Sequence, residues 1–367
     1  MTMRTTRRRV CALDDTPEGS NNLPSPTNSD CRAAVDRLRQ RVFVAVAILV
    51  LLVANAATTS AARQGEGSLI VKASGVRLRE RPDTGAAEVG RLQLGSVIAV
   101  VERAAEKTKV GASEDYWYLV SAQGGARGWV FGGLVAPFDP TRREEIYVKL
   151  SNDKTSNASA TFAEMSDLVR FLDRAVKEVT RRDALGELEL ARLVALAHSL
   201  ASFSIQDQEK PPYKSWTAEH EREIVYSEPS GQWLVRADLF WNLQRKYRSL
   251  PLLAERAAWE AAQTPLPGEC EGYLPCHLGL ETMTNGNYLE LYPRGAHADA
   301  ALANIAELLG QISEDLRGSD PVYNVPREDR ADFHKLVATL RTQIALTASP
   351  KKAGLLKQLE AITRRFP

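Results

Sequence analysis

Residues 69–138 read LIVKASGVRLRERPDTGAAEVGRLQLGSVIAVVERAAEKTKVGASEDYWYLVSAQGGARGWVFGGLVAPF, a pattern of short strands separated by turns. Apolar and basic residues alternate along 76–79, so the two apolar side chains face one way and the two arginines the other. Residues 97–101 (VIAVV) are uncharged and largely β-branched, and residues 116–120 (YWYLV) are mostly aromatic, as strands favour. Proline and glycine between these runs mark turns. Several short strands with frequent turns predict one small all-β barrel, which we expect to span residues 67–138.

Four motifs in this stretch resemble, in order and spacing, those of the bacterial SH3-like (SH3b) domain family. The family begins with an apolar-Asn-Val-Arg-x-x-Pro-Ser pattern, which is similar to residues 76–83, and continues with a Val-x-Gly-x-Leu segment similar to residues 89–95. Its Trp-x-x-Val strand is similar to residues 117–120, and its final Gly-Trp-Val with a closing apolar residue is similar to residues 128–134. The chain departs from the family at Arg77, where Asn is usual, and residues 107–115 predict a long polar loop. The resemblance implies an SH3-like barrel and a module that binds cell wall or protein.

Aromatic side chains on neighbouring strands suggest where such a module binds. Trp117 and Tyr118 must face opposite sides of their strand, so one belongs to the core and the other to the surface. An exposed tyrosine beside basic side chains would form an aromatic and basic groove suited to a peptide or a glycan stem. The alternative is that the aromatic residues only pack the barrel. The candidate ligand-binding residues are Arg77, Arg79, Tyr116, Tyr118 and Trp129.

The N-terminal part has the pattern of an export signal. Residues 1–34 are polar and rich in Arg, Pro, Ser and Asn, which predicts a disordered extension. Within residues 35–62, arginines precede the apolar run VFVAVAILVLLV at 42–53, and small residues follow it. We favour a cleaved signal peptide; the alternative is an uncleaved membrane anchor through residues 42–57. A start at Val35 would give the signal an ordinary basic beginning and would make residues 1–34 a gene-model artefact.

Composition and cysteine spacing narrow the class of protein. The chain has 47 Lys and Arg against 46 Asp and Glu, so no long-range field favours nucleic acid as a partner. In the oxidising compartment that export implies, Cys270 and Cys276 are expected to form a disulfide. The Cys-x5-Cys spacing lies outside the usual gap for zinc, and no glycine-rich phosphate loop follows a strand. We therefore expect neither a metal nor a cofactor.

An alternative role for Cys270 is that of a peptidase nucleophile. SH3b domains often accompany NlpC-type cell-wall peptidases, and Glu269-Cys270-Glu271-Gly272 loosely resembles the nucleophile motif of those enzymes. Those enzymes also need a histidine on a following strand to activate the thiol. Downstream of Cys270 the sequence has a helical period, so His297 and His334 fall in helical pattern. We therefore favour the disulfide.

Residues 161–367 change to a helical period, after a linker at 139–160 in which residues 143–150 suit one more strand. Thr161-Phe162-Ala163-Glu164 has the form of a capping box, and several amphipathic segments follow, including one at 232–247. The segment around Tyr292-Pro293 resembles the Tyr-Pro hairpins of tetratricopeptide-type envelope proteins, over one helix pair only. We expect a multidomain protein in which an all-α bundle or short helical array follows the barrel.

These features predict an exported binding or scaffold protein of the bacterial cell envelope, periplasmic or extracellular and non-catalytic. Its barrel would contact peptidoglycan or a protein segment of the envelope. The second hypothesis is a cell-wall peptidase with Cys270 as its nucleophile. A third is a helical adaptor in a multiprotein complex, with the barrel as an accessory.

Overall fold

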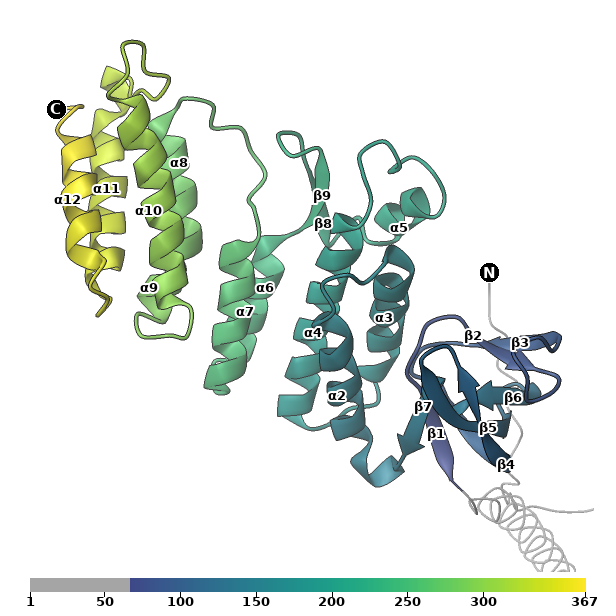
Figure 1. Ribbon diagram of the computed structural model, residues 1–367. Helices are drawn as coiled ribbons and strands as arrows, with labels where there is room; N and C mark the ends of the chain where they lie inside the picture. Colours follow the sequence, from purple (N-terminus) through teal and green to yellow (C-terminus); the bar gives the residue numbers. More distant parts are fainter. Residues whose placement is uncertain (1–66) are drawn as a thin grey trace, which may run out of the picture. The chain divides into compact units, whose positions relative to one another are not determined.

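The computed structural model describes residues 67–367, which belong to one compact unit (Figure 1). A β domain comes first and a helical region follows, so the predicted order of the two is confirmed. The predictions made for residues 1–34, for 35–62 and for the apolar segment 42–57 lie outside the described residues.

Seven strands form one antiparallel sheet in the order β3-β2-β6-β5-β4-β1-β7. Buried aliphatic side chains such as Leu78, Val120 and Val130 fill its interior. The sheet and these apolar residues give the expected SH3-like half-barrel. The strands are β1 (Ser68–Val71), β2 (Val76–Arg79), β3 (Glu88–Leu92), β4 (Val97–Val110), β5 (Ser113–Ser121), β6 (Arg127–Phe131) and β7 (Val135–Phe138).

The prediction of a loop at residues 107–115 is wrong. The end of β4 and the start of β5 pair there and form a hairpin, which we call the hairpin arm. Lys107 pairs with Tyr116, and the pairing continues as far as Val110 and Ser113, leaving a two-residue turn between the strands. Most side chains of the arm are exposed. Backbone hydrogen bonds between the two strands hold such an arm together, so its side chains need not be apolar. The sequence of the arm is therefore as polar as that of a loop.

Helix α3 lies where the sequence predicted a helix behind a capping box. The capping box expected before α3 is confirmed: the Thr161 amide donates to the Glu164 carboxylate at 2.9 Å, and the Glu164 amide donates to the Thr161 hydroxyl at 3.4 Å. The helices are α2 (Arg143–Thr155), α3 (Phe162–Ala175), α4 (Arg182–Ala201), α5 (Tyr213–Glu219), α6 (Ala237–Lys246), α7 (Pro251–Gln263), α8 (Leu274–Glu281), α9 (Asn287–Leu291), α10 (Ala298–Asp315), α11 (Arg330–Ala345) and α12 (Lys352–Thr363).

Two predicted elements of this region differ in the structure. Residues 143–150, considered as one more strand inside a linker at 139–160, belong to helix α2 (Figure 1). The first part of the helix predicted at 232–247 is instead a strand: β8 (Ile224–Ser227) and β9 (Gln232–Val235) form a hairpin, and α6 starts only afterwards. Cross-strand packing of aromatic rings favours this pairing over a longer helix. The region is therefore helical with one β-hairpin rather than all-α.

The β domain and the first helices share one hydrophobic cluster. Ile70, Leu94 and Phe138 of the β domain belong to the same cluster as Tyr147 of α2 and Phe171 of α3. The Tyr147 ring lies 6.3 Å from the Phe138 ring and 5.1 Å from the Phe171 ring, measured between centroids. The two parts are thus joined by buried apolar surface as well as by the chain.

A half-buried ionic network joins α3, α4 and the segment before β8. The Arg192 guanidinium of α4 donates to both oxygens of Glu223, at 2.6 and 3.0 Å, and also bonds Asp173 of α3. The His220 ring lies 3.0 Å from the second Glu223 oxygen. The Arg192 side chain is only 18% exposed, so its two carboxylate partners balance a charge that is largely withdrawn from water.

Across residues 67–367, none of the helices combines the length and the apolar character that crossing a membrane requires.

Candidate functional site

The register of β5 and β6 sorts the aromatic side chains onto two faces of the sheet. Trp117 pairs with Phe131, and Trp129 pairs with both Leu119 and Arg79. Because side chains alternate along a strand, these residues share one face of the sheet. We call this face, formed by Arg77, Arg79, Trp117, Leu119, Trp129 and Phe131, the aromatic-basic face.

A groove of about 360 Å³ opens on the aromatic-basic face. Arg77 and Arg79 of β2 line it together with Trp117, Phe131 and Leu134. The Trp117 and Phe131 rings meet edge to face at 5.6 Å and are 3% and 5% exposed, so they make a fixed apolar floor. The groove therefore combines an apolar base with two cationic side chains, as sites for amphipathic ligands do.

One hydrogen-bond donor of this groove has no protein partner. The Trp117 Nε1 atom is buried, and no acceptor among the described residues bonds it. Buried N–H groups are normally satisfied.

The two arginines of β2 differ in how firmly they are held. Arg79 Nη1 donates to the Ala86 carbonyl at 2.7 Å, which fixes the guanidinium against the turn. Arg77 lies 3.3 Å from Glu88 and is 55% exposed, so water screens that pair and a ligand could replace it. A hydrogen bond from Arg91, followed by the charges of Arg91 and Arg77, lowers the pKa of Glu88 and keeps the carboxylate ionised.

The structure brings together only part of the predicted set of binding residues. Arg77 and Arg79 line the groove, and Trp129 lies on the same face beside Arg79. Tyr118 instead packs against the apolar interior of the sheet. Tyr116 lies on the hairpin arm, where Arg103 and Lys107 sit over its ring at 4.5 and 5.5 Å.

Sequence reasoning missed the groove residues Phe131 and Leu134 and assigned Trp117 no binding role. That Trp117 and Tyr118 face opposite sides is confirmed. Two fully buried valines, Val120 of β5 and Val130 of β6, identify the inner face of the sheet. Tyr118 shares their face and Trp117 does not. Reading the two strands together would therefore have placed Trp117 on the same face as Arg79.

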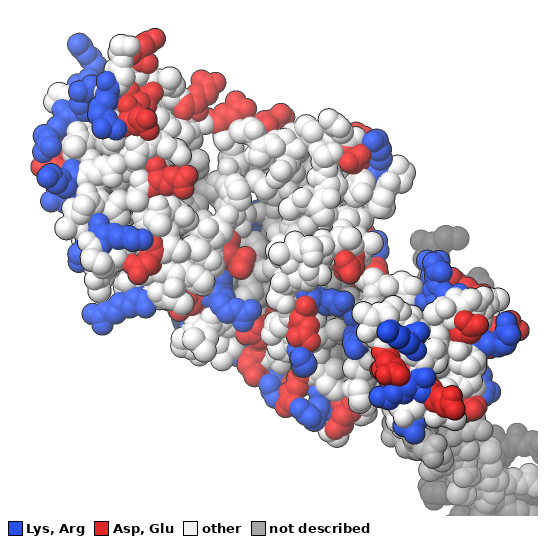
Figure 2. All heavy atoms as spheres, viewed as in Figure 1, with Lys and Arg blue, Asp and Glu red and all other residues white. Residues whose placement is uncertain are grey.

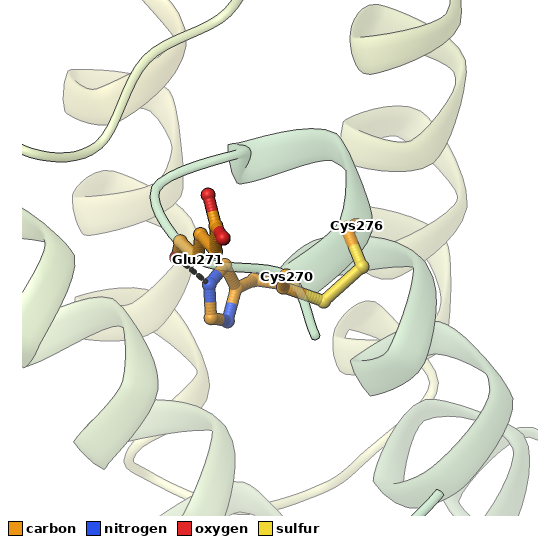
Figure 3. The surroundings of a disulfide bond; sticks show 4 residues. Cys270, Glu271 and Cys276 are labelled. Atoms are coloured by element: carbon orange, nitrogen blue, oxygen red, sulfur yellow. Dashed lines mark hydrogen bonds between the residues drawn. A yellow bond between two sulfur atoms is a disulfide. The ribbon is translucent and has the colours of Figure 1, made fainter. Parts of the chain in front are cut away.

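The predicted disulfide is present, and it changes what Cys270 can do. Cys270 and Cys276 are bonded with an S–S distance of 2.02 Å (Figure 3). The Nε2 atom of His277 lies 2.7 Å from the Glu271 carbonyl oxygen (Figure 3). The sulfur of a disulfide is not the thiolate that a cysteine peptidase requires.

Within residues 67–367, no group of three His, Cys, Asp or Glu side chains is placed to hold a metal ion. Figure 2 shows both Lys and Arg and Asp and Glu on one face of the molecule, with a wide uncharged area between them, in keeping with the near-neutral composition.

Comparison with known families bears on the β domain alone. Residues 74–136 match the family described as the bacterial SH3 domain, which confirms the resemblance found in the sequence. The match begins just before β2 and ends within β7, so it includes the whole aromatic-basic face. No curated protein matches the chain.

Proposed function

We propose that this chain is an exported, non-catalytic binding protein of the bacterial cell envelope whose aromatic-basic face holds peptidoglycan or an extended protein segment. Bacterial SH3 domains commonly bind peptidoglycan or other cell-wall components, and residues 74–136 form such a domain. The observation that carries the proposal is the groove itself, in which Arg77 and Arg79 lie beside an apolar floor that includes Trp117 and Phe131.

The chemistry of the groove suits a peptide stem. Peptide carbonyls and carboxylates can accept hydrogen bonds from the guanidinium groups of Arg77 and Arg79. Alkyl side chains can cover the Trp117 and Phe131 rings. The bond between Cys270 and Cys276 supports the non-catalytic part of the proposal, because it occupies the only nucleophile that the sequence singled out.

A sedimentation assay with purified peptidoglycan tests this function. Residues 67–367 should co-sediment with the polymer, and Arg77→Gln should weaken binding roughly tenfold or more, because a hydrogen bond to a charged partner contributes about 1.5–3 kcal/mol. Trp117→Phe keeps one aromatic ring in the floor but removes the rest of the indole, including its N–H, so it should weaken binding by a smaller factor. Arg142→Gln, an exposed substitution that lies after β7 and outside the groove, serves as the matched control.

The binding data can contradict the proposal in two ways. Failure of residues 67–367 to bind peptidoglycan would remove the polymer as a ligand. Equal weakening by Arg77→Gln and Arg142→Gln would show that binding follows overall charge rather than the groove.

A further inference from the structure

A second cavity, larger than the groove, lies where the β3–β4 segment meets α2 and α3. It encloses about 570 Å³, within the range of small-molecule sites. Its walls include Arg91 and Ser96 from the sheet side, Phe138, and Arg143, Tyr147 and Arg174 from the helices. Neither the bacterial SH3 match nor the proposed function assigns a role to it.

The charges that line this cavity are unbalanced. Three guanidinium groups, those of Arg91, Arg143 and Arg174, face one carboxylate, that of Glu178. Arg91 has a partner outside the cavity, since its Nε donates to Glu88 at 2.7 Å. Within residues 67–367, Glu178 is the single carboxylate that lines the cavity. The two guanidinium groups of Arg143 and Arg174 therefore leave an excess of positive charge.

Arg174 is held in position from the sheet side. Its Nη2 atom donates to the backbone carbonyl of Leu94 at 3.0 Å, which leaves the other guanidinium N–H groups free for further partners. This bond ties the end of α3 to the turn before β4. The positive charge of Arg174 is therefore fixed at the cavity wall by the fold.

Arg143 carries the clearest sign that a partner belongs here. Its Nε atom is buried and has no hydrogen-bond partner within residues 67–367. Its Nη1 atom lies 3.7 Å from Glu178, too far for a good hydrogen bond. Since the whole side chain is 40% exposed, a ligand entering the cavity can reach the guanidinium.

Tyr147 limits how much of this charge Glu178 can neutralise. The Tyr147 hydroxyl donates to the same Glu178 oxygen that faces Arg143, at 3.0 Å. Burial, and then the hydrogen bond to Glu178, raise the pKa of Tyr147 to about 12, so this hydroxyl remains a donor at neutral pH. The oxygen of Glu178 nearest Arg143 is thus already engaged.

We propose that this cavity binds a small organic carboxylate, with Arg143 and Arg174 holding the carboxylate and Phe138 covering the apolar part of the ligand. Guanidinium groups pair with carboxylates through two parallel hydrogen bonds, which the terminal N–H groups of Arg143 and Arg174 would supply. An apolar wall favours an organic acid over a bare inorganic ion. The carboxylate could be the free C-terminus of a short peptide or a dicarboxylic acid. The site does not depend on the groove of the proposed function.

Isothermal titration calorimetry with residues 67–367 tests the site, using four probes: acetyl-Ala-Ala with a free carboxylate, the same peptide as its amide, glutarate, and inorganic phosphate. We expect at least one carboxylate probe to bind, and the amide to bind at least tenfold more weakly than the free acid. A preference for the peptide acid or for glutarate identifies the source of the carboxylate. Arg143→Gln should weaken binding roughly tenfold or more. Arg142→Gln is the matched control, because Arg142 is the preceding residue, is 67% exposed and does not line the cavity.

Any of three results with the probes would overturn the proposal: no heat of binding with either carboxylate, equal affinity for acid and amide, or tighter binding of phosphate than of both carboxylates. Equal effects of Arg143→Gln and Arg142→Gln would also overturn it. Far-UV circular dichroism of both variants checks that they fold. Arg77→Gln, in the groove, should leave binding of these probes unchanged, so failure here and failure of the proposed function are distinguishable.

Discussion

Replacing Glu223 by Gln should lower the free energy of unfolding by about 3 kcal/mol at neutral pH and by almost nothing near pH 2. In the folded chain, burial raises the pKa of Glu223, but hydrogen bonds from His220 and Arg192 outweigh it and lower the value from 4.5 to about 2. Each pKa unit corresponds to about 1.4 kcal/mol, so the ionised carboxylate stabilises the fold by about 3 kcal/mol relative to the protonated form. The Glu223 side chain is 28% exposed, so solvent screens this stabilisation only in part.

The dependence on pH follows from the direction of that pKa change. The pKa is lower in the folded chain than in the unfolded chain, so the stabilisation is complete above pH 4.5 and is lost as the pH falls through about 2. Glutamine resembles the protonated carboxyl and keeps a constant charge. The difference between native and variant protein should therefore shrink steadily across this window.

Urea unfolding of residues 67–367 at neutral pH, at pH 4.5 and near pH 3.5 measures the difference, followed by tryptophan fluorescence. Trp216 is a suitable reporter because its ring lies 4.3 Å from the His220 ring. Glu209→Gln is the matched control: Glu209 also pairs with a basic side chain, Lys214, but is 74% exposed, so its loss should change stability by less than about 1 kcal/mol. A Glu223→Gln effect no larger than that of Glu209→Gln, or one that stays constant from neutral pH to pH 3.5, would refute the reasoning.

Two further substitutions test how the parts are held together. Gly95→Ala should lower the free energy of unfolding by at least about 2 kcal/mol, because the new Cβ would lie 2.0 Å from the Phe171 ring; Gly75→Ala, which also has a positive φ but nothing within 4 Å, should cost distinctly less in the same thermal or urea unfolding assay. In residues 67–367, neither Cys270 nor Cys276 should react with a thiol reagent before reduction and both should react after it, with a loss of about 2 kcal/mol in stability that a Cys270→Ala/Cys276→Ala variant reproduces. An unreduced protein with two reactive thiols would contradict the second expectation.

The sequence predicted elements well where one face of a segment is buried. The apolar stripe behind Thr161 corresponds to helix α3, which begins with the predicted capping box. Prediction failed where composition and pairing disagree. Residues 107–115 are polar yet paired, and Gln232–Val235 pair with β8 although the residues that follow them form a helix. Pairing depends on a partner strand, which the local pattern alone does not show.

The candidate groove was half predictable for a related reason. Arg77 and Arg79 were found because their alternation with apolar residues is local to β2. The aromatic partner was misassigned because a single strand states only that Trp117 and Tyr118 face opposite ways. Which of them faces the groove depends on the pairing of Val120 and its neighbours with β6. The arginine-lined cavity could not be predicted from the sequence, because its residues come from the sheet and from two helices that only the folded chain brings together.

The sequence of strand β1 indicates that the β domain packs against another part of the chain. Leu69, Ile70 and Val71 are all buried, although their side chains alternate between the two faces of the strand. Leu69 and Val71 belong to the interior of the sheet, whereas Ile70 belongs to the cluster shared with α2 and α3. An uninterrupted apolar run is what a strand covered on both faces requires, while a strand with one face in water would alternate. The run at 69–71 therefore indicates a partner on the outer face of the barrel, and in this chain that partner is the helical region that also walls the arginine-lined cavity.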